Sequence, residues 1–190
     1  MTRALATTSL SVSAISALYA AKGGRMYSGE PVTQLEHALQ SAWLAERAGA
    51  AESLVAASLL HDIGHMVNDR GETPTERGVD DLHQYHALAV LRGLFPEAVL
   101  EPIRWHVDAK RYLCRARPEY HDALSPDSKR SLVLQGGVFS TQEAEAFAAR
   151  PRADDAVQLR LWDDLAKVAG ERTPEWAHFE AILERVASSN

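Results

Sequence analysis

The sequence predicts an all-α protein that folds as one compact domain over residues 1–190. Apolar residues recur at helical spacing in nearly every periodic segment, and no segment alternates convincingly as a strand would. Two Ser/Thr-x-x-Glu capping boxes and well-placed Pro and Gly residues mark where helices begin and end. The length suits a single core, and we find neither an internal repeat nor a linker.

Two helices are expected before residue 50. The first spans 8–21 and is stopped by the pair Gly23-Gly24. The second begins at Thr33, which forms a capping box with Glu36, and continues to Gly49. The apolar stripes of these helices are expected to be Leu10, Ala14, Ala17 and Leu18, then Leu35, Leu39, Ala42 and Trp43, with His37 near the edge of the second stripe.

A buried helix and a polar loop should follow. Residues 52–60 contain too few polar side chains for a surface helix. Residues 67–80 are polar and contain Gly and Pro, which predicts an exposed loop. Residues 82–94 return to helical spacing and carry His83 and His86.

The second half of the chain is expected to be helical as well. Pro96 and Pro102 each look like a first helical residue, so two helices are predicted there, and 115–125 should be a loop. The remaining helices are expected from Ser125-Pro126 to Gly136-Gly137, from the capping box of Ser140 and Glu143 to near Pro151, from Arg152 to Ala169 before Gly170, and from Thr173-Pro174 to about Val186.

Composition limits the possible partners and compartment. Hydrophobic residues make up 46% and charged residues 24% of the chain, as in ordinary globular proteins. The formal net charge is −6 and no Lys/Arg block occurs, which argues against a nucleic-acid partner. The single cysteine, Cys114, excludes an internal disulfide and fits the cytoplasm. No segment has the roughly 20 apolar residues needed to span a membrane.

The stretch Leu-Leu-His-Asp-Ile-Gly-His at 59–65 ends the predicted buried helix with potential metal ligands. Imidazole nitrogens and carboxylate oxygens bind first-row metals. A buried Asp62 beside His61 and His65 would be costly without a cation. A purely structural alternative also fits the dipeptide alone, with His61 in a core hydrogen bond and Asp62 capping the next turn.

The other histidines extend this pattern. Several predicted helices carry one His each, and a late Asp follows, as metal sites between packed helices require. This order resembles the HD-domain superfamily, whose signature is a His, then His-Asp, then a late Asp. The resemblance implies two metals bridged by Asp62, the first completed by His37, His61 and Asp163, the second by His83 and His106.

A narrower resemblance covers nearly the whole chain. It rests on Tyr-Ser-Gly-Glu-Pro-Val-Thr-Gln at 27–34, Leu-His-Asp-Ile-Gly-His at 60–65, Leu-Val-Leu-Gln-Gly-Gly at 132–137 and Leu-Trp-Asp-Asp at 161–164. These segments resemble the mixed-valent di-iron oxygenases that cleave 1-hydroxyphosphonates (the PhnZ type). The resemblance implies two iron ions, Fe(II)/Fe(III), and O2 as co-substrate. The substrate would be a small 1-hydroxyphosphonate, such as 2-amino-1-hydroxyethylphosphonate or its N-trimethyl analogue, cleaved to phosphate and glycine or glycine betaine.

An anionic substrate fits the neighbours of the ligands. Lys110 follows His106 by four residues and Arg160 precedes Asp163 by three, so each pair shares a helix face. With His65 they would supply charge-assisted donors for a phosphonate. A solvated, salt-bridging helix face is the alternative for both cations.

The family resemblance implies further catalytic residues. Tyr27 would cap one iron in the resting state, and Glu30 would meet the amine of the substrate as the tyrosine leaves. Ser131 and Gln135 could add hydrogen bonds to the phosphonate or hydroxyl.

Two ligand choices have close competitors. His83 is preferred to His86 because its surroundings match the family pattern, although Gln84 stands where the family usually has Glu and Ala87 where it has Gly. Asp163 is preferred to Asp164 by its spacing from Arg160. His121 and His178 are expected at the surface.

The alternatives at the level of function are a metal-dependent HD phosphohydrolase acting on a phosphate ester or nucleotide, and a non-catalytic HD domain. No obligate protein partner is evident from the sequence.

Overall fold

The computed structural model of the protein describes residues 10–27, 29–68 and 74–188. Throughout these residues every regular element is a helix, and the only β-type pairings are the isolated bridges Met26–Thr33 and Arg92–Phe95. The expected all-α fold is therefore confirmed. The elements are α1 (Val12–Lys22), α2 (Gln34–Arg47), α3 (Glu52–Leu60), α4 (Ile63–Val67), the 3-10 turn η1 (Thr75–Arg77), α5 (His83–Leu91), α6 (Glu97–Ala116), α7 (Pro118–Ala123), α8 (Pro126–Leu134), α9 (Thr141–Ala148), α10 (Ala153–Leu165) and α11 (Trp176–Ser188).

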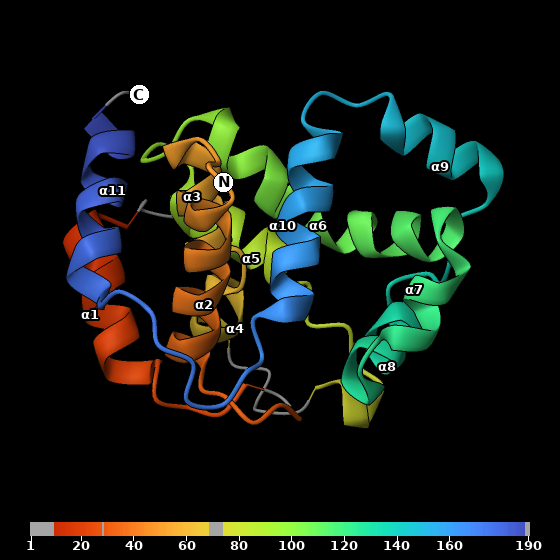
Figure 1. Ribbon diagram of the computed structural model, residues 1–190, viewed down its shortest axis with the longest axis horizontal. Coiled ribbons are helices and arrows are strands. Elements are labelled where there is room, and N and C mark those ends of the chain that lie inside the picture. The colour runs from red at the N-terminus through yellow and green to blue at the C-terminus, as the bar shows by residue number, and fades with distance from the viewer. Residues whose placement is uncertain (1–9, 28, 69–73, 189–190) are drawn as a thin grey trace, which may run out of the picture.

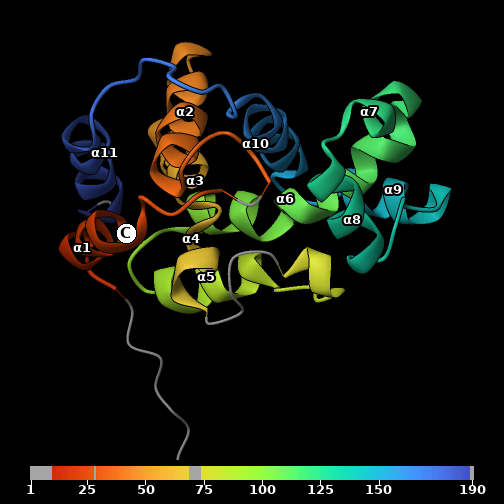
Figure 2. The same ribbon diagram turned by 90° about the horizontal axis from the view of Figure 1, so that it is seen from below.

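The helices α2, α3, α6 and α10 form the centre of the molecule (Figure 1). The helices α1 and α11 flank one end, and α7, α8 and α9 lie at the other. Seen from below, α4 and α5 cover the same centre (Figure 2). The largest buried apolar cluster joins α1, α2, α3, α4, α5, α6, α10 and α11, and a smaller one ties α9 to α6 and α10.

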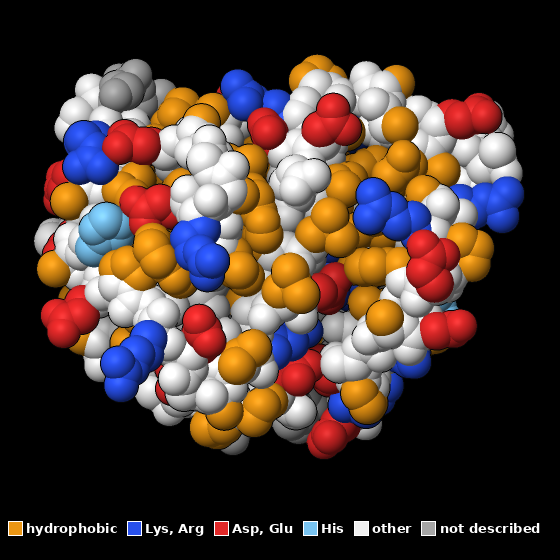
Figure 3. Space-filling model, viewed as in Figure 1, with side chains coloured by type: hydrophobic (Ala, Val, Ile, Leu, Met, Phe, Trp, Pro, Cys, Tyr) orange, Lys and Arg blue, Asp and Glu red, His pale blue; other side chains and the backbone are white. Residues whose placement is uncertain are grey.

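The face of the molecule drawn in Figure 3 has no broad patch of a single charge. Lys/Arg and Asp/Glu side chains are interspersed with hydrophobic ones on the face drawn in Figure 3. Within the described ranges, no helix is both long and apolar enough to cross a bilayer.

Local capping chemistry sets several helix starts as predicted. The Thr33 hydroxyl accepts a bond from the Glu36 amide, and the Glu36 carboxylate accepts one from the Thr33 amide. Ser140 and Glu143 form the same reciprocal box before α9. The Ser125 hydroxyl caps α8, with proline at the first helical position. These starts are confirmed.

Leu10 and Leu18 of the predicted first stripe pack against the core, and so do all four residues of the second, Leu35, Leu39, Ala42 and Trp43. In α1 the buried residues are Val12, Ile15 and Tyr19, whereas Ala17 is exposed. The start predicted at Thr8 lies outside the described residues, and α1 begins at Val12. In α2 the buried side comprises His37, Ala38, Gln40, Ser41, Ala42 and Ala45, and His37 is fully buried instead of lying near an edge. Polar residues occupy that side because they contact the functional site and a neighbouring backbone.

The region 96–125 is more helical than predicted. Pro96 is the cap residue and Pro102 lies inside one 20-residue helix, α6. Pro102 is tolerated because it is only the sixth residue, where its ring removes a single backbone hydrogen bond. The expected loop at 115–125 contains the end of α6 and the short helix α7.

Three other boundaries differ from the prediction. Helix α5 ends at Leu91, because Arg92 is extended and Gly93 has a positive φ of 83°. Helix α10 ends at Leu165, four residues before the predicted end at Ala169. The following chain leaves the helix to bond with α2: the Gln40 amide pairs with both the N–H and the carbonyl of Val168. Helix α11 begins at Trp176, after Thr173-Pro174.

The buried helix α3 spans 52–60 as predicted, and the chain then breaks at His61-Asp62. Asp62 has φ −102° and ψ 8°, in the sparsely populated bridge region where many active-site residues lie. A short helix that was not predicted, α4, starts immediately afterwards. The exposed loop expected at 67–80 is confirmed at 76–78. Pro74, in contrast, is buried, and Thr75–Arg77 form a 3-10 turn. Residues 69–73 lie outside the described residues.

Candidate metal centre

The Asp62 carboxylate lies between two pairs of imidazoles. Its Oδ2 atom is 3.6 Å from Nε2 of His37 and 3.4 Å from Nε2 of His61. Its Oδ1 atom is 3.4 Å from Nε2 of His83 and 3.7 Å from Nε2 of His106. Each oxygen therefore faces a different pair, as it would in a carboxylate that bridges two cations.

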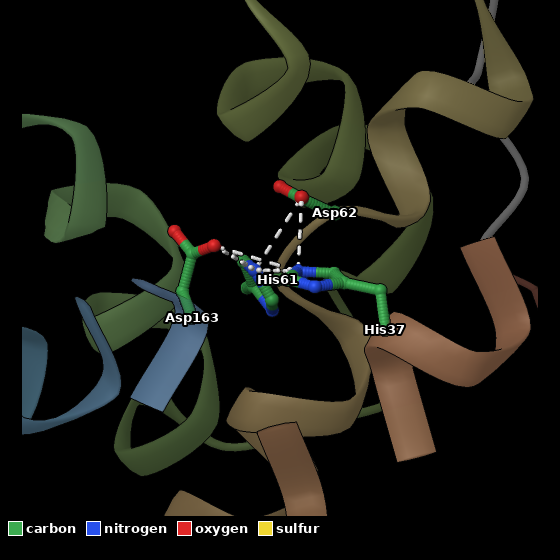
Figure 4. Close-up of side chains that lie close together, drawn as sticks. All are labelled: His37, His61, Asp62 and Asp163. Carbon is green, nitrogen blue, oxygen red and sulfur yellow. Dashed lines mark hydrogen bonds and ion pairs between the residues drawn. The ribbon is translucent and has the colours of Figure 1, made fainter. Parts of the chain in front are cut away.

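Asp163 completes the first group (Figure 4). Its Oδ1 atom lies 3.5 Å from Nε2 of His37 and 3.9 Å from Nε2 of His61. The four side chains come from α2, from the break after α3 and from α10, and all are buried. Three segments distant in the sequence thus meet at one point.

His83 and His106 form the second group with Asp62. His83 is the first residue of α5, and His106 lies in the middle of α6. Their Nε2 atoms are 2.9 Å apart. All six side chains of the expected ligand set therefore lie in one buried cluster.

Each of the four imidazoles has an oxygen acceptor for its outer nitrogen. Because these oxygens can only accept, Nδ1 carries the proton and Nε2 presents its lone pair to the cluster. The bonds run from His37 to Ala166 O at 2.9 Å, from His61 to Ser58 O at 2.9 Å, from His106 to Ile103 O at 2.7 Å and from His83 to Asp81 Oδ1 at 2.9 Å.

This donor set fits metal cations. The Nε2 atoms of His37 and His61 are 3.3 Å apart, so two lone pairs face each other with no proton between them. Oδ1 of Asp163 is buried and has no hydrogen-bond partner among the described residues. A bound cation would relieve both conditions, and ligand atoms about 2.1 Å from one metal lie about 3 Å from each other.

The surroundings of His37, His106 and Asp62 favour their metal-binding protonation states, whereas at His61 burial is outweighed by the neighbouring carboxylates of Asp62 and Asp163, which raise the pKa of His61. Burial is the largest cause that lowers the pKa of His37 to about 4. Burial, followed by the His83 imidazole, holds the pKa of His106 well below its ordinary value. Burial alone would raise the pKa of Asp62, but the surrounding imidazoles lower it below the usual range. Neutral imidazole and ionised carboxylate are the forms that bind metals.

Tyr27 covers one side of the first group. Its ring stacks on His37 with centroids 4.0 Å apart, and its hydroxyl donates to Asp62 Oδ2 at 2.8 Å. Glu30, in the same loop, lies apart from the cluster. Its carboxylate is 3.5 Å from Nζ of Lys167, which in turn lies 5.8 Å from the centroid of the Tyr27 ring.

A cavity of about 220 Å³ opens beside the cluster. Five of the six expected substrate-binding residues line its wall: His65, Lys110, Ser131, Gln135 and Arg160. The sixth, Glu30, does not line it. Lys110 Nζ donates to Ser131 Oγ at 2.7 Å. Burial, then the Arg160 charge, lowers the pKa of Lys110 to about 7. The buried Gln135 Oε1 has no partner among the described residues.

Arg160 joins the cavity to the metal cluster. Its NH1 group donates to Asp163 Oδ2 at 2.6 Å, its NH2 group to Asp164, and its Nε to the Tyr120 hydroxyl at 3.0 Å. Bonds to described residues therefore use one N–H on each nitrogen, whereas a guanidinium has five. The second N–H on each terminal nitrogen can serve a ligand in the cavity.

Sequence reasoning missed Asp81 and Tyr120. Asp81 accepts bonds from both His65 and His83, but a carboxylate two residues before a histidine is too common to mark such a role. Tyr120 lay in a segment read as loop. Of the remaining histidines, His86, His121 and His178 belong to none of the ligand groups found among the described residues.

Comparison with known proteins gives consistent matches. The family model for the HD domain matches residues 35–167. A Leisingera caerulea protein named [1-hydroxy-2-(trimethylamino)ethyl]phosphonate dioxygenase (glycine-betaine-forming) is 36% identical over 93% of this chain and 90% of its own. A Gimesia maris protein named hydroxymethylphosphonate dioxygenase is 41% identical over 85% of this chain and 81% of its own. An uncharacterised protein of Acanthamoeba polyphaga mimivirus is 34% identical over 90% and 80%.

Proposed function

Since the chain belongs to the HD-domain family and two of its relatives are named as phosphonate dioxygenases, we propose that it is a dioxygenase that cleaves the C–P bond of a small 1-hydroxyphosphonate. The reaction balances as one hydroxyphosphonate and one O2 giving one phosphate and one carboxylic acid. Depending on the substituent at C1, the acid would be formate, glycine or glycine betaine.

The observation that carries this proposal is the division of Asp62 between two ligand groups beside a cationic cavity. One metal position would be held by His37, His61, Asp62 and Asp163, and the other by Asp62, His83 and His106. We infer that both ions are iron, as an Fe(II)/Fe(III) pair. When bound, they supply Lewis acidity, a template for the substrate and redox chemistry toward O2.

The cavity residues would bind the phosphonate. Lys110 and the two remaining N–H groups of Arg160 offer charge-assisted donors, and Ser131 extends the site through its bond to Lys110. Gln135 Oε1 is an acceptor suited to the 1-hydroxyl of the substrate. The imidazole of His65 faces the same space.

Tyr27 and Glu30 would govern access to the first metal position. The Tyr27 ring stacks on His37 and its hydroxyl bonds to Asp62, so Tyr27 would have to move away before a substrate could reach this side of the first metal position. Glu30 would reach an ammonium group on the substrate only by leaving Lys167.

Oxygen dependence tests the proposal directly. Iron-loaded protein would be incubated with hydroxymethylphosphonate and with the two amine-bearing substrates, in air and anaerobically, while phosphate and O2 are measured. We expect phosphate in air only, with one O2 consumed per phosphate. Equal release without O2 from a phosphonate or a phosphate ester would identify a hydrolase. Bound metal without turnover of either class would identify a non-catalytic domain.

A further inference from the structure

Both oxygens of the Asp81 carboxylate are bonded to imidazoles of the site. Oδ2 lies 2.6 Å from Nδ1 of His65, and Oδ1 lies 2.9 Å from Nδ1 of His83. Asp81 is 6% exposed, so water competes little for these bonds. One buried side chain therefore fixes a residue of the cavity wall and a residue of the second ligand group together.

The two rings are aligned as a consequence. The His65 and His83 rings stack with centroids 4.2 Å apart and planes 23° from parallel. Their Nε2 atoms lie 3.7 Å and 3.4 Å from the same atom, Oδ1 of Asp62. Asp81 on one side and Asp62 on the other thus hold a double layer of imidazoles.

The backbone is specialised to produce this arrangement. Leu82, between Asp81 and His83, has φ 54° and ψ 33°, a left-handed conformation that is unfavourable for a leucine. Its side chain is 40% exposed, so burial offsets little of that strain. Across the contact, Gly64 lets α4 approach the backbone of His83 so closely that a Cβ atom would lie 1.9 Å from the His83 carbonyl oxygen.

Asp81 also differs from the acceptors of the other three ligand imidazoles. His37, His61 and His106 are bonded to uncharged backbone carbonyls, whereas His83 is bonded to a carboxylate. A carboxylate acceptor orients the ring and raises the basicity of the ligating nitrogen. The second metal position alone has this support among the described residues.

We propose that Asp81 is a positioning residue that selectively sustains the second metal position, the one formed by Asp62, His83 and His106, and couples it to His65 in the substrate cavity. This inference rests on the proposed two-metal function. Loss of the carboxylate should weaken binding of one ion and leave the ion held by His37, His61 and Asp163 in place.

Asp81→Asn is the informative change because it keeps the shape of the side chain. The asparagine carbonyl can accept from one imidazole, but its NH2 group can only donate to the other. The ring that faces the NH2 group must turn over or move its proton to Nε2, and in either orientation of the amide the ligand His83 loses the negative charge beside its Nδ1–H. Asp80→Asn is the matched control, since the Asp80 carboxylate accepts from the Leu82 amide and bonds to no imidazole among the described residues.

The test is an anaerobic Mn²⁺ titration that is monitored by calorimetry and by electron paramagnetic resonance. Wild-type protein and Asp80→Asn should bind two ions and give the spectrum of a coupled pair. Asp81→Asn should retain one ion at wild-type affinity, bind the second 10–100-fold more weakly and give the spectrum of an isolated ion. Two ions bound at wild-type affinity by Asp81→Asn, or equal weakening of both, would overturn the inference. A wild-type protein that binds one ion would instead refute the two-metal function.

Nitrogen NMR of the wild-type protein provides a second measurement if Asp81→Asn does not fold. In the Zn²⁺-loaded protein, long-range ¹H–¹⁵N spectra should show His83 protonated at Nδ1 and bound through Nε2. A proton on Nε2 of His83 would overturn the inference without any variant.

Discussion

Asp62 concentrates the chemistry of this protein at a single residue. Each of its oxygens faces two of the four ligand imidazoles, so neither candidate metal position is complete without it. We therefore expect Asp62→Ala to lose both metal ions, as measured by elemental analysis after iron loading. Asp122→Ala, at a carboxylate 88% exposed, should keep both. One full equivalent retained by Asp62→Ala would contradict the bridging role.

Lys110 makes binding of the phosphonate dependent on pH. Burial, then Arg160, lowers the pKa of Lys110 to about 7, so the free enzyme loses this charge as the pH rises through that value. We expect kcat/KM for a hydroxyphosphonate to fall above about pH 7, because the neutral amine attracts the anion less. The measurement is a pH profile of kcat/KM.

Lys110→Arg supplies the control for this profile, since a guanidinium stays charged throughout the range. The descending limb should vanish or move to higher pH in the variant. Any limb caused by ionisation of the substrate should remain in both proteins. Identical profiles would show that Lys110 does not titrate in the step measured.

Glu30 is the site residue whose observed position agrees least with its expected role. It pairs with Lys167 and does not line the cavity. If it moves to meet an ammonium group, Glu30→Ala should raise KM for 2-amino-1-hydroxyethylphosphonate about tenfold, which corresponds to one charged hydrogen bond. KM for hydroxymethylphosphonate should change little. An unchanged ratio of the two constants would remove Glu30 from the site.

For single residues, the sequence indicated which side chains meet but not what surrounds them. The order of His and Asp residues pointed to the cluster through its resemblance to the HD-domain signature. The fully buried position of His37 was missed, since hydrophobic periodicity gives no weight to polar side chains that face a site. Asp81 was missed because its partners are brought to it by α4 and α5, whose packing is not local.

Among the elements, the contact between α4 and α5 leaves no room for a side chain at Gly64. A methyl group on Gly64 would collide with the His83 backbone, so Gly64→Ala must push the start of α5 away. We expect a loss of about 1–3 kcal/mol in the free energy of unfolding. Thermal denaturation and metal content would measure the effect, and both should fall together.

Gly24→Ala is the matched control, because a Cβ at Gly24 meets nothing within 4 Å. Its stability should stay within about 0.5 kcal/mol of wild type. Equal stability of the two variants would mean that α5 can move freely relative to α4.

Helix boundaries were predictable where the signal is local. The capping boxes at Thr33 and Ser140 and the Ser125 cap set their helices directly. Pro102 misled because proline near a helix start and proline at a helix start look alike in sequence. The predicted end of α10 was wrong because the chain leaves the helix after Leu165. There the carbonyls of Ala166 and Val168 bond to His37 and Gln40, which are remote in sequence.

For the whole molecule, bound metal should act as a cross-link between helices. The cluster joins α2, α5, α6 and α10 to the break after α3. An ion present at 100 times its dissociation constant stabilises the folded state by about 2.7 kcal/mol. For a chain of this length that corresponds to a rise of about 5–10 °C in Tm.

Chelation should therefore lower Tm by about 5–10 °C for each ion removed, as followed by calorimetry. Re-addition of iron under anaerobic conditions should restore the original value. A Tm that is insensitive to chelator, in protein shown to have lost its metal, would mean that the helices need no ion to stay together.

The hydrogen-bond acceptors of the four ligand imidazoles differ in whether a mutation can remove them. Three of them are backbone carbonyls, of Ser58, Ile103 and Ala166, which no codon change can delete. The fourth belongs to Asp81, which a single nucleotide change can replace. Laboratory evolution toward a different metal preference should therefore select its first substitutions at Asp81. The orientations of the other three imidazole rings are fixed by the backbone and persist as long as the fold does.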